Sequence, residues 1–295
     1  MTIIIGLVVT LACMLGGFAA MGGHIEVIWQ PFEYIIILGA SLGTFIVANP
    51  VKVIKDVGVA FKEAATNAAP KKADYLEVLG CLFVLMRELK TKSRSEVEAH
   101  IDSPGESAIF QAFPKVLANE KLVTFITDYM RLILMGSART HEIEALMDEE
   151  IQTLRGDKLK AYHAVVAVSE GLPALGIVAA VLGVIKAMGA LDQSPEVLGH
   201  LIGAALVGTF AGIFFSYAVF SPIATQIKIV REKKMRKFIV VKQTLLALMN
   251  GAMPQIAVEH GRKAISSSER PSVDELEQQT LATGAAGAES AKQAA

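Results

Sequence analysis

Few side chains in the apolar stretches of this 295-residue chain could bind or transfer a proton. Lys186 lies inside 171–191, and His200 and Tyr217 lie within 197–227. Lys186 can extend its ammonium toward the outer interface, and His200 lies at the outer end of its stretch. Passage of protons or cations through lipid usually depends on an intramembrane carboxylate. The interiors of the apolar stretches contain no Asp or Glu, so we expect another subunit to supply it.

The chain has four apolar stretches, of which 171–191 is the third and the fourth lies within 197–227. Small residues recur every three or four positions in these two. Rows of this kind let helices approach closely in lipid, and packing explains most of these residues. Thr209 and Ser216 lie on the same row, and their hydroxyls could alternatively face a polar path. The rows comprise Gly176, Ala180, Gly183, Ala187 and Ala190, and Ala205, Gly208, Thr209, Gly212 and Ser216.

Two prolines, Pro173 and Pro222, stand near the inner ends of these stretches. A proline at a helix start costs little, which alone would explain Pro173. The helical pattern continues through Pro222 and predicts one long helix over 223–265. A proline inside a continuing helix removes a backbone hydrogen bond and bends the helix, so Pro222 is expected to mark a bend. Because the third stretch runs outward and the fourth returns, both prolines are expected at one depth, as a paired hinge.

A charged stretch outside the apolar segments carries Arg87, Lys90, Arg94 and Glu98 at spacings of three and four. On a single helix these side chains would share one face. The simplest interpretation is a solvated face with one weak Arg94–Glu98 pair. The alternative is a docking surface, where the arrangement of charges selects a partner of opposite pattern.

The sequence lacks the motifs of common enzyme classes, including the phosphate-binding loop, the HExxH zinc motif, GxSxG and the dinucleotide fingerprint. The acidic run 147–150 places adjacent carboxylates in different directions around a helix, which favours a solvated face over a metal site. We therefore expect a protein that is not an enzyme and that uses no metal and no cofactor.

Composition indicates an integral membrane protein in contact with lipid. Hydrophobic residues make up 53% of the chain and charged residues 19%. The mean hydropathy is +0.47, above the range of ordinary soluble domains. The net charge of −1 argues against a nucleic-acid partner, which would require a concentrated basic surface.

The elements that must position these residues are four membrane helices. Loops between the first and second spans and between the third and fourth contain no Lys or Arg, whereas basic residues fill 52–160 and 228–242. The positive-inside rule then places both termini in the cytoplasm. The predicted segments are a membrane hairpin (1–51), a helical cytoplasmic domain (52–168), two more spans (169–227), cytoplasmic C-terminal helices (228–280) with a capping box at Ser272–Glu275, and a disordered tail (281–295).

The chain resembles the A subunits of bacterial flagellar stators, within the MotA/TolQ/ExbB proton-channel family. The resemblance covers nearly the whole length except the tail. It rests on GGHIEVIWQPFEYIIILGASLGTFIVAN, THEIEALMDEEI, GLPALGIVAAVLG, VGTFAGIFFSYAVFSPIAT and PQIAVEHGRKAISSSERPSVDELE.

The resemblance implies an inner-membrane ring of A subunits around a B-subunit dimer, which brings the membrane Asp and a peptidoglycan anchor. It implies that Pro173 and Pro222 couple ion flow to cytoplasmic movement and that Thr209 faces the channel. Sodium-driven relatives carry Thr at the position of Ala180, so protons are the expected ion. Glu98 matches a rotor-contacting Glu; Lys90 stands where relatives carry Arg, with Arg87 and Arg94 flanking it.

Two alternatives remain at this point. One is an energiser of outer-membrane processes of the TolQ/ExbB type, although those relatives have three spans and an outside N-terminus. The other is a membrane scaffold that passes no ions. The expected function is a stator subunit that converts the proton-motive force into torque on the rotor switch complex, with chemotaxis and swimming motility as its context.

Overall fold

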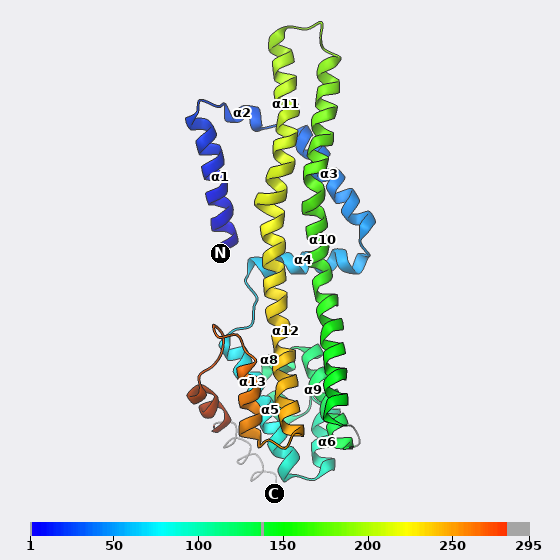
Figure 1. Ribbon diagram of the computed structural model, residues 1–295, viewed down its shortest axis with the longest axis vertical. Coiled ribbons are helices and arrows are strands. Elements are labelled where there is room, and N and C mark those ends of the chain that lie inside the picture. Colours follow the sequence, from blue (N-terminus) through cyan, green and yellow to red (C-terminus); the bar gives the residue numbers. More distant parts are fainter. Residues whose placement is uncertain (1, 137–138, 282–295) are drawn as a thin grey trace. The chain divides into compact units, whose positions relative to one another are not determined.

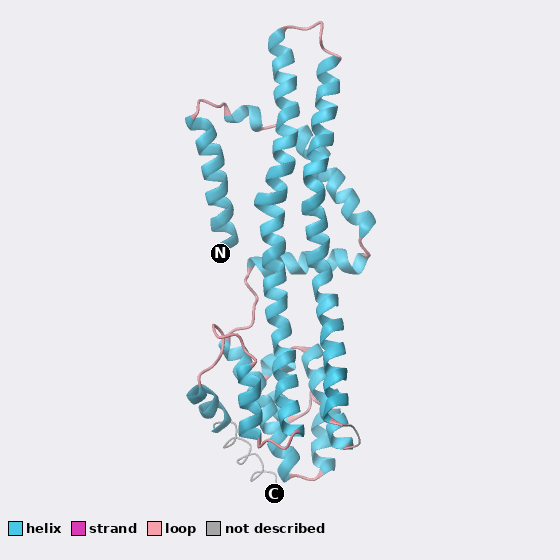
Figure 2. Ribbon diagram, in the orientation of Figure 1, coloured by secondary structure: helices cyan, strands magenta, loops and turns pink. Residues whose placement is uncertain are grey.

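The computed structural model describes residues 2–136 and 139–281, and every regular element within these ranges is a helix (Figure 2). The all-α prediction is confirmed. Most of the predicted tail, residues 282–295, lies outside the described residues. The chain forms two compact units: a span unit, Met1–Ala68 with Asp157–Arg231, and a second unit, Ala69–Gly156 with Glu232–Ala295.

Four helical stretches in the described chain are long and apolar enough to cross a membrane, which confirms the predicted number of spans. The first is α1 (Thr2–Ala20), and the second is α3 (Pro31–Ala48), which follows the one-turn helix α2 (Ile25–Ile28). The third lies in α10 (Thr140–Met188). The fourth begins with α11 (Pro195–Phe214), passes through the π-helix η1 (Phe215–Phe220) and continues as α12 (Ser221–Met249; Figure 1).

The contact between α10 and α11 depends on glycine. A Cβ atom on Gly212 would lie 2.6 Å from the backbone oxygen of Leu172 and 2.8 Å from Cα of Gly176. A Cβ on Gly183 would lie 2.7 Å from Cβ of Ala205. Larger residues would force the helices apart, so the small rows predicted from spacing form this helix–helix contact.

Helix α4 (Val51–Ala65) packs across α10 and α12 within the span unit (Figure 1). Its Ala60 and Ala64 are buried in a cluster whose other buried members are Ala161, Val165, Ala224 and Ile227. A charged interaction fixes the same contact. The Arg231 side chain is 1% exposed and forms ion pairs with Asp56 at 2.5 Å and Glu63 at 3.3 Å. It also donates to the backbone oxygen of Lys158 at 2.7 Å. This network satisfies a guanidinium that would otherwise be costly to bury.

The second unit is a helical domain with its own core. Its helices are α5 (Lys72–Thr91), α6 (Arg94–Asp102), α7 (Ala108–Gln111), α8 (Pro114–Leu117), α9 (Glu120–Met135) and α13 (Pro254–Lys263), with parts of α10 and α12. Buried apolar side chains from these helices meet in one cluster, in which Phe125 packs edge-on against Phe238 with ring centroids 5.3 Å apart. The helical periodicity of the cytoplasmic block therefore reflects a packed core.

The single long helix predicted over 223–265 is wrong. Helix α12 ends at Met249, and α13 starts at Pro254. Gly251 between them has φ +88°, a left-handed conformation that side chains other than glycine rarely adopt. The Asn250–Gly251 pair is a turn signal that the longer apolar pattern obscured.

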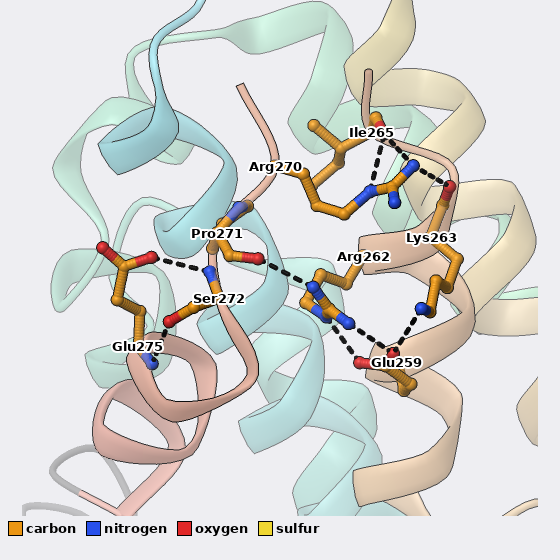
Figure 3. A network of polar contacts seen from close by, with 8 residues as sticks. All are labelled: Glu259, Arg262, Lys263, Ile265, Arg270, Pro271, Ser272 and Glu275. Carbon is orange, nitrogen blue, oxygen red and sulfur yellow. Dashed lines mark hydrogen bonds and ion pairs between the residues drawn. The ribbon is translucent and has the colours of Figure 1, made fainter. Parts of the chain in front are cut away.

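The segment after α13 folds back as a strap, residues 264–281, held by charged groups (Figure 3). Arg262 binds Glu259 through two nitrogens at 2.6 Å and donates to the backbone oxygen of Pro271 at 2.8 Å. The predicted capping box is confirmed: the backbone N–H of Ser272 donates to Glu275, and the backbone N–H of Glu275 donates to the Ser272 hydroxyl. Residues 273–281 are helical.

Candidate functional site

The two residues expected along the ion path, Ala180 and Thr209, lie on facing helices in the span unit. Gly208 on α11 lies directly against α10 at Ala180: the point that a Cβ on Gly208 would occupy is 3.3 Å from the backbone nitrogen of Ala180. Thr209 is the next residue on α11, and both Ala180 and Thr209 are half-buried. The structure thus brings the two predicted positions to the same level of the helix pair.

An acidic side chain reaches this level, although the interiors of the apolar stretches contain no Asp or Glu. Glu33 lies in the first turn of α3, and its Oε2 atom is 3.2 Å from the position that a Cβ on Gly208 would take. This oxygen is buried, and among the described residues it has no hydrogen-bond partner. Glu33 reaches this level because α3 begins beside Gly208 and not beside the outer end of α11.

Helix α3 is held at this height by its apolar face. One turn after Glu33, Ile37 is fully buried in a cluster with Leu172, Ala179 and Ala211. Tyr34 donates its hydroxyl to the backbone oxygen of Ile28 at 2.5 Å, which fixes the connection into α3. The position of the Glu33 carboxyl is therefore set by packing on both sides of its backbone.

A hydrogen bond joins α10 to the π-helix below this level. The Ser169 hydroxyl donates to the backbone oxygen of Ser216 at 3.0 Å, and both residues are buried. The same oxygen accepts the backbone N–H of Ser221, five residues along the chain, as a π-helix requires. The Ser216 hydroxyl lies 3.3 Å from the Ser169 hydroxyl, which favours the packing interpretation of this residue.

The π-helix ends at Phe220, two residues before Pro222, and the two features have one cause. Proline has no N–H to donate, and its ring collides with the carbonyl four residues earlier in a regular α-helix. Widening the preceding turn to a π-helix moves that carbonyl away. Pro173, by contrast, lies inside α10 with regular α-helix on both sides.

The two prolines do not lie at one depth, so this expectation is wrong. The Ser169–Ser216 bond fixes the register of the antiparallel helices. Pro173 is four residues beyond this bond in one direction, and Pro222 is six residues beyond it in the other. At about 1.5 Å per residue the offset is roughly 15 Å along the helix axes. The fourth apolar stretch is longer than the third, so matching their inner ends misaligned the two helices.

The charged stretch belongs to two helices, and the expected single face is wrong. Arg87 and Lys90 lie on α5, whereas Arg94 and Glu98 lie on α6. Ser93 caps α6 by accepting the Glu96 N–H, and Glu96 accepts the Ser93 N–H at 2.9 Å. Hydrogen bonds from the Ser93 hydroxyl and backbone lower the pKa of Glu96. The Ser-x-x-Glu pattern at 93–96 was a readable start signal for this second helix.

The contacts of the four charged residues differ. The Arg94 Nε and Glu98 Oε1 atoms are 2.7 Å apart in the predicted i,i+4 pair. Lys90 donates to the backbone oxygen of Ala252 at 3.3 Å, next to the turn between α12 and α13. Arg87 lies 4.0 Å from Glu88. Arg94 is exposed, Glu98 is half-buried, and both face outward enough to meet another molecule.

Two acids of the run 147–150 form interactions inside the second unit. Asp148 pairs with Lys242 at 2.6 Å, and Glu150 accepts the Tyr129 hydroxyl at 2.9 Å. This contact and burial raise the pKa of Tyr129. Across residues 2–136 and 139–281, no group of three or more His, Cys, Asp and Glu side chains could hold a metal ion.

Comparisons with known proteins agree with this architecture. A family model described as motility protein A N-terminal matches residues 4–93, and the MotA/TolQ/ExbB proton channel family model matches 117–238. The chain is 42% identical to motility protein A of Escherichia coli over 282 residues, covering 96% of each chain. It is 33% identical to chemotaxis protein LafT of Vibrio parahaemolyticus over 92% of this chain and 96% of that one.

Solved structures show the same fold. MotAB of C. jejuni matches with a TM-score of 0.72 at 19% identity, covering 92% of this chain and 98% of that one. The flagellar MotAB stator complex of Bacillus subtilis matches with a TM-score of 0.64 at 21% identity, covering 87% and 92%. The chain is a multi-pass membrane protein that belongs to the motility protein A family, within the MotA/TolQ/ExbB proton channel family.

Proposed function

We propose that this chain is the A subunit of a proton-driven flagellar stator in the bacterial inner membrane. The observation that carries the proposal is whole-length similarity to motility protein A, combined with a glycine-lined helix pair that brings Ala180 and Thr209 together. A hydroxyl at the position of Ala180 would be expected for sodium, so its methyl group favours protons. Both termini and the second unit face the cytoplasm, as the distribution of Lys and Arg indicates.

The partners follow from the same family. The similar structures are named as MotAB complexes, which supports a B-type partner for this chain. We assign to this partner the principal membrane Asp and the peptidoglycan anchor, with several copies of the A subunit in a ring around it. The rotor switch-complex protein is the cytoplasmic partner.

Proton passage would be converted into movement through α10 and the α11–α12 helix. Helix kinks commonly occur at π-helical turns, so bending would concentrate at the π-helix before Pro222. Pro173 supplies a separate flexible point on α10. The Ser169–Ser216 bond lies between the levels of these points, so the two helices bend at different depths about one fixed contact.

Single substitutions test this arrangement. Pro173→Ala and Pro222→Ala should each preserve membrane insertion and co-purification with the B-type partner, yet abolish or strongly reduce torque. Pro195→Ala is the matched control, because Pro195 occupies the first turn of α11, where proline costs little. Torque is measured by the rotation of tethered cells. Normal rotation in both test variants would contradict a role for the prolines in coupling.

The surface offered to the rotor comprises Arg87 and Lys90 on α5 and Arg94 and Glu98 on α6. The capped turn at 92–93 orients the two helix ends, so the surface presents charges at two angles. Glu98→Lys removes the Arg94 partner and should reduce swimming, whereas Glu106→Lys, an exposed acid on the following turn, should not. A charge reversal on the rotor protein should restore swimming with Glu98→Lys. Absence of rescue by any rotor charge variant would count against this surface.

A TolQ/ExbB-type energiser is less well supported, because the motility protein A N-terminal match at 4–93 covers the additional hairpin that such energisers lack. A scaffold without ion flux is distinguished by experiment. Cells that express the chain with its B-type partner should acidify faster than cells that express either subunit alone. Equal acidification would favour the scaffold.

A further inference from the structure

We propose that the Glu33 carboxyl is a second proton-binding group of the ion path, placed beside Ala180 and Gly208 in the A subunit itself. This inference rests on the proposed function and adds a site to it. The principal carboxylate is assigned to the partner subunit because the interiors of the apolar stretches contain no Asp or Glu. The structure places a carboxyl of this chain at the same level as the predicted path residues.

Burial without a partner is the first observation. Glu33 Oε2 is the buried side-chain oxygen or nitrogen that lacks a hydrogen bond within the described residues. An ionised carboxylate oxygen is costly to bury where no protein donor compensates the lost hydration. Binding of one proton to the carboxylate, which forms the neutral acid, removes this cost without any other reactant. The site is therefore suited to take up and release a proton.

The surrounding groups give the site a direction. Ala179 Cβ, Ala180 N and Glu33 Oε2 all lie 3.2–3.3 Å from the point where a Gly208 Cβ would stand, so the carboxyl occupies space that glycine leaves open. Lys186 lies on α10, the helix that also carries Ala180. Six residues separate Lys186 from Ala180, or roughly 9 Å along the helix toward the outer end.

The titratable groups nearest the site are thus few. Lys186 lies on the outer side, and Tyr34 follows Glu33 but commits its hydroxyl to the backbone of Ile28. A proton that reaches the level of Ala180 and Thr209 would meet the Glu33 carboxylate there. The neutral acid would then release its proton along the ion path when the partner subunit's Asp carries no proton.

Three variants of the full chain, co-expressed with the B-type partner, test the proposal. Glu33→Gln keeps the shape of the side chain but cannot exchange a proton. Glu33→Asp keeps the acid and withdraws it by one methylene. Glu196→Gln, at an exposed acid in the first turn of α11, is the matched control. Proton flux is measured as cytoplasmic acidification, and complex formation as co-purification.

We expect Glu33→Gln to assemble and to lose proton flux by on the order of a hundredfold, the low end for a positioned proton donor or acceptor. Glu33→Asp should retain flux with a displaced dependence on external pH, and Glu196→Gln should match the parent chain. Equal flux in Glu33→Gln and the parent would overturn the inference and leave the stator function intact. If the parent complex itself passes no protons, the proposed function fails instead.

Infrared spectroscopy gives a readout that does not require flux. The parent complex and Glu196→Gln should show the carbonyl band of a protonated carboxylic acid that Glu33→Gln lacks, with intensity that changes with pH. If Glu33→Gln fails to assemble, Glu33→Asp provides the test. A carboxylic acid band in Glu33→Asp that is shifted in frequency from that of the parent would assign the band to residue 33. Spectra without any band assignable to residue 33 across the pH range would refute proton binding there.

Discussion

Gly212→Ala probes the closest approach of α10 and α11. The new Cβ would lie 2.6 Å from the Leu172 backbone oxygen, whereas ordinary contact begins at 3.4 Å. The helices must therefore separate by about 0.8 Å, because both close neighbours are backbone atoms that cannot rotate away. One turn further, the Ser169–Ser216 bond of 3.0 Å would stretch beyond hydrogen-bonding distance.

The expected cost is the balance of two effects. Overpacking costs about 1–3 kcal/mol, and alanine regains roughly 0.5–1 kcal/mol over glycine in a helix. Gly212→Ala should therefore lower stability by about 1–2 kcal/mol. Gly171→Ala on α10 is the matched control, since nothing lies within 4 Å of its Cβ, and it should be neutral or stabilising.

Stability is measured as the midpoint of thermal unfolding of the detergent-solubilised chain, followed by size-exclusion chromatography of heated samples. Swimming of cells provides the functional readout, and Gly212→Ala should impair it more than its expression level explains. Equal midpoints for Gly212→Ala and Gly171→Ala would refute the argument that backbone contact at this crossing requires glycine.

Arg231→Gln should destabilise the span unit by about 3–5 kcal/mol, because it leaves Asp56 and Glu63 facing a neutral side chain. Adding Asp56→Asn and Glu63→Gln should recover much of the lost stability. Stability is measured as the resistance of the membrane-inserted chain to protease. Acid should release the strap, because hydrogen bonds from Lys233 and Ser268 lower the pKa of Glu269 below its ordinary 4.5. A lowered folded-state pKa means that this stabilisation is present above the ordinary value and is lost as the pH falls through the lower one. Hydrogen exchange of residues 264–281 should accelerate below about pH 4 and lose this pH dependence in Glu269→Gln; a dependence that survives the substitution would assign it elsewhere.

Local signals in the sequence predicted much of the fold. Hydropathy identified the four spans, and the Ser272–Glu275 spacing identified a capping box that the structure contains. The breaks at Ser93 and Gly251 had signals too, a Ser-x-x-Glu start and an Asn-Gly turn. Those signals were outweighed by apolar or charged periodicity that continued across them.

Relations between distant elements were not predictable in the same way. The height of α3 against α10 and α11 depends on Ile37 packing with residues 135 to 174 positions away, so the level of Glu33 could not be predicted from its own neighbours. Burial of Arg231 likewise depends on partners on another helix. Arginine side chains are usually exposed in proteins, so the burial of Arg231 could be recognised only from the fold.

The Arg231 network also has a consequence for biosynthesis. Asp56 precedes its partner by 175 residues, and Arg231 is the last residue of the span unit. While the chain is being made, α4 emerges with two carboxylates whose guanidinium has not yet been translated. Helix α4 therefore cannot pack in its final position until the fourth span has entered the membrane. Truncation before residue 231 should leave α4 accessible to protease even when all four spans are inserted.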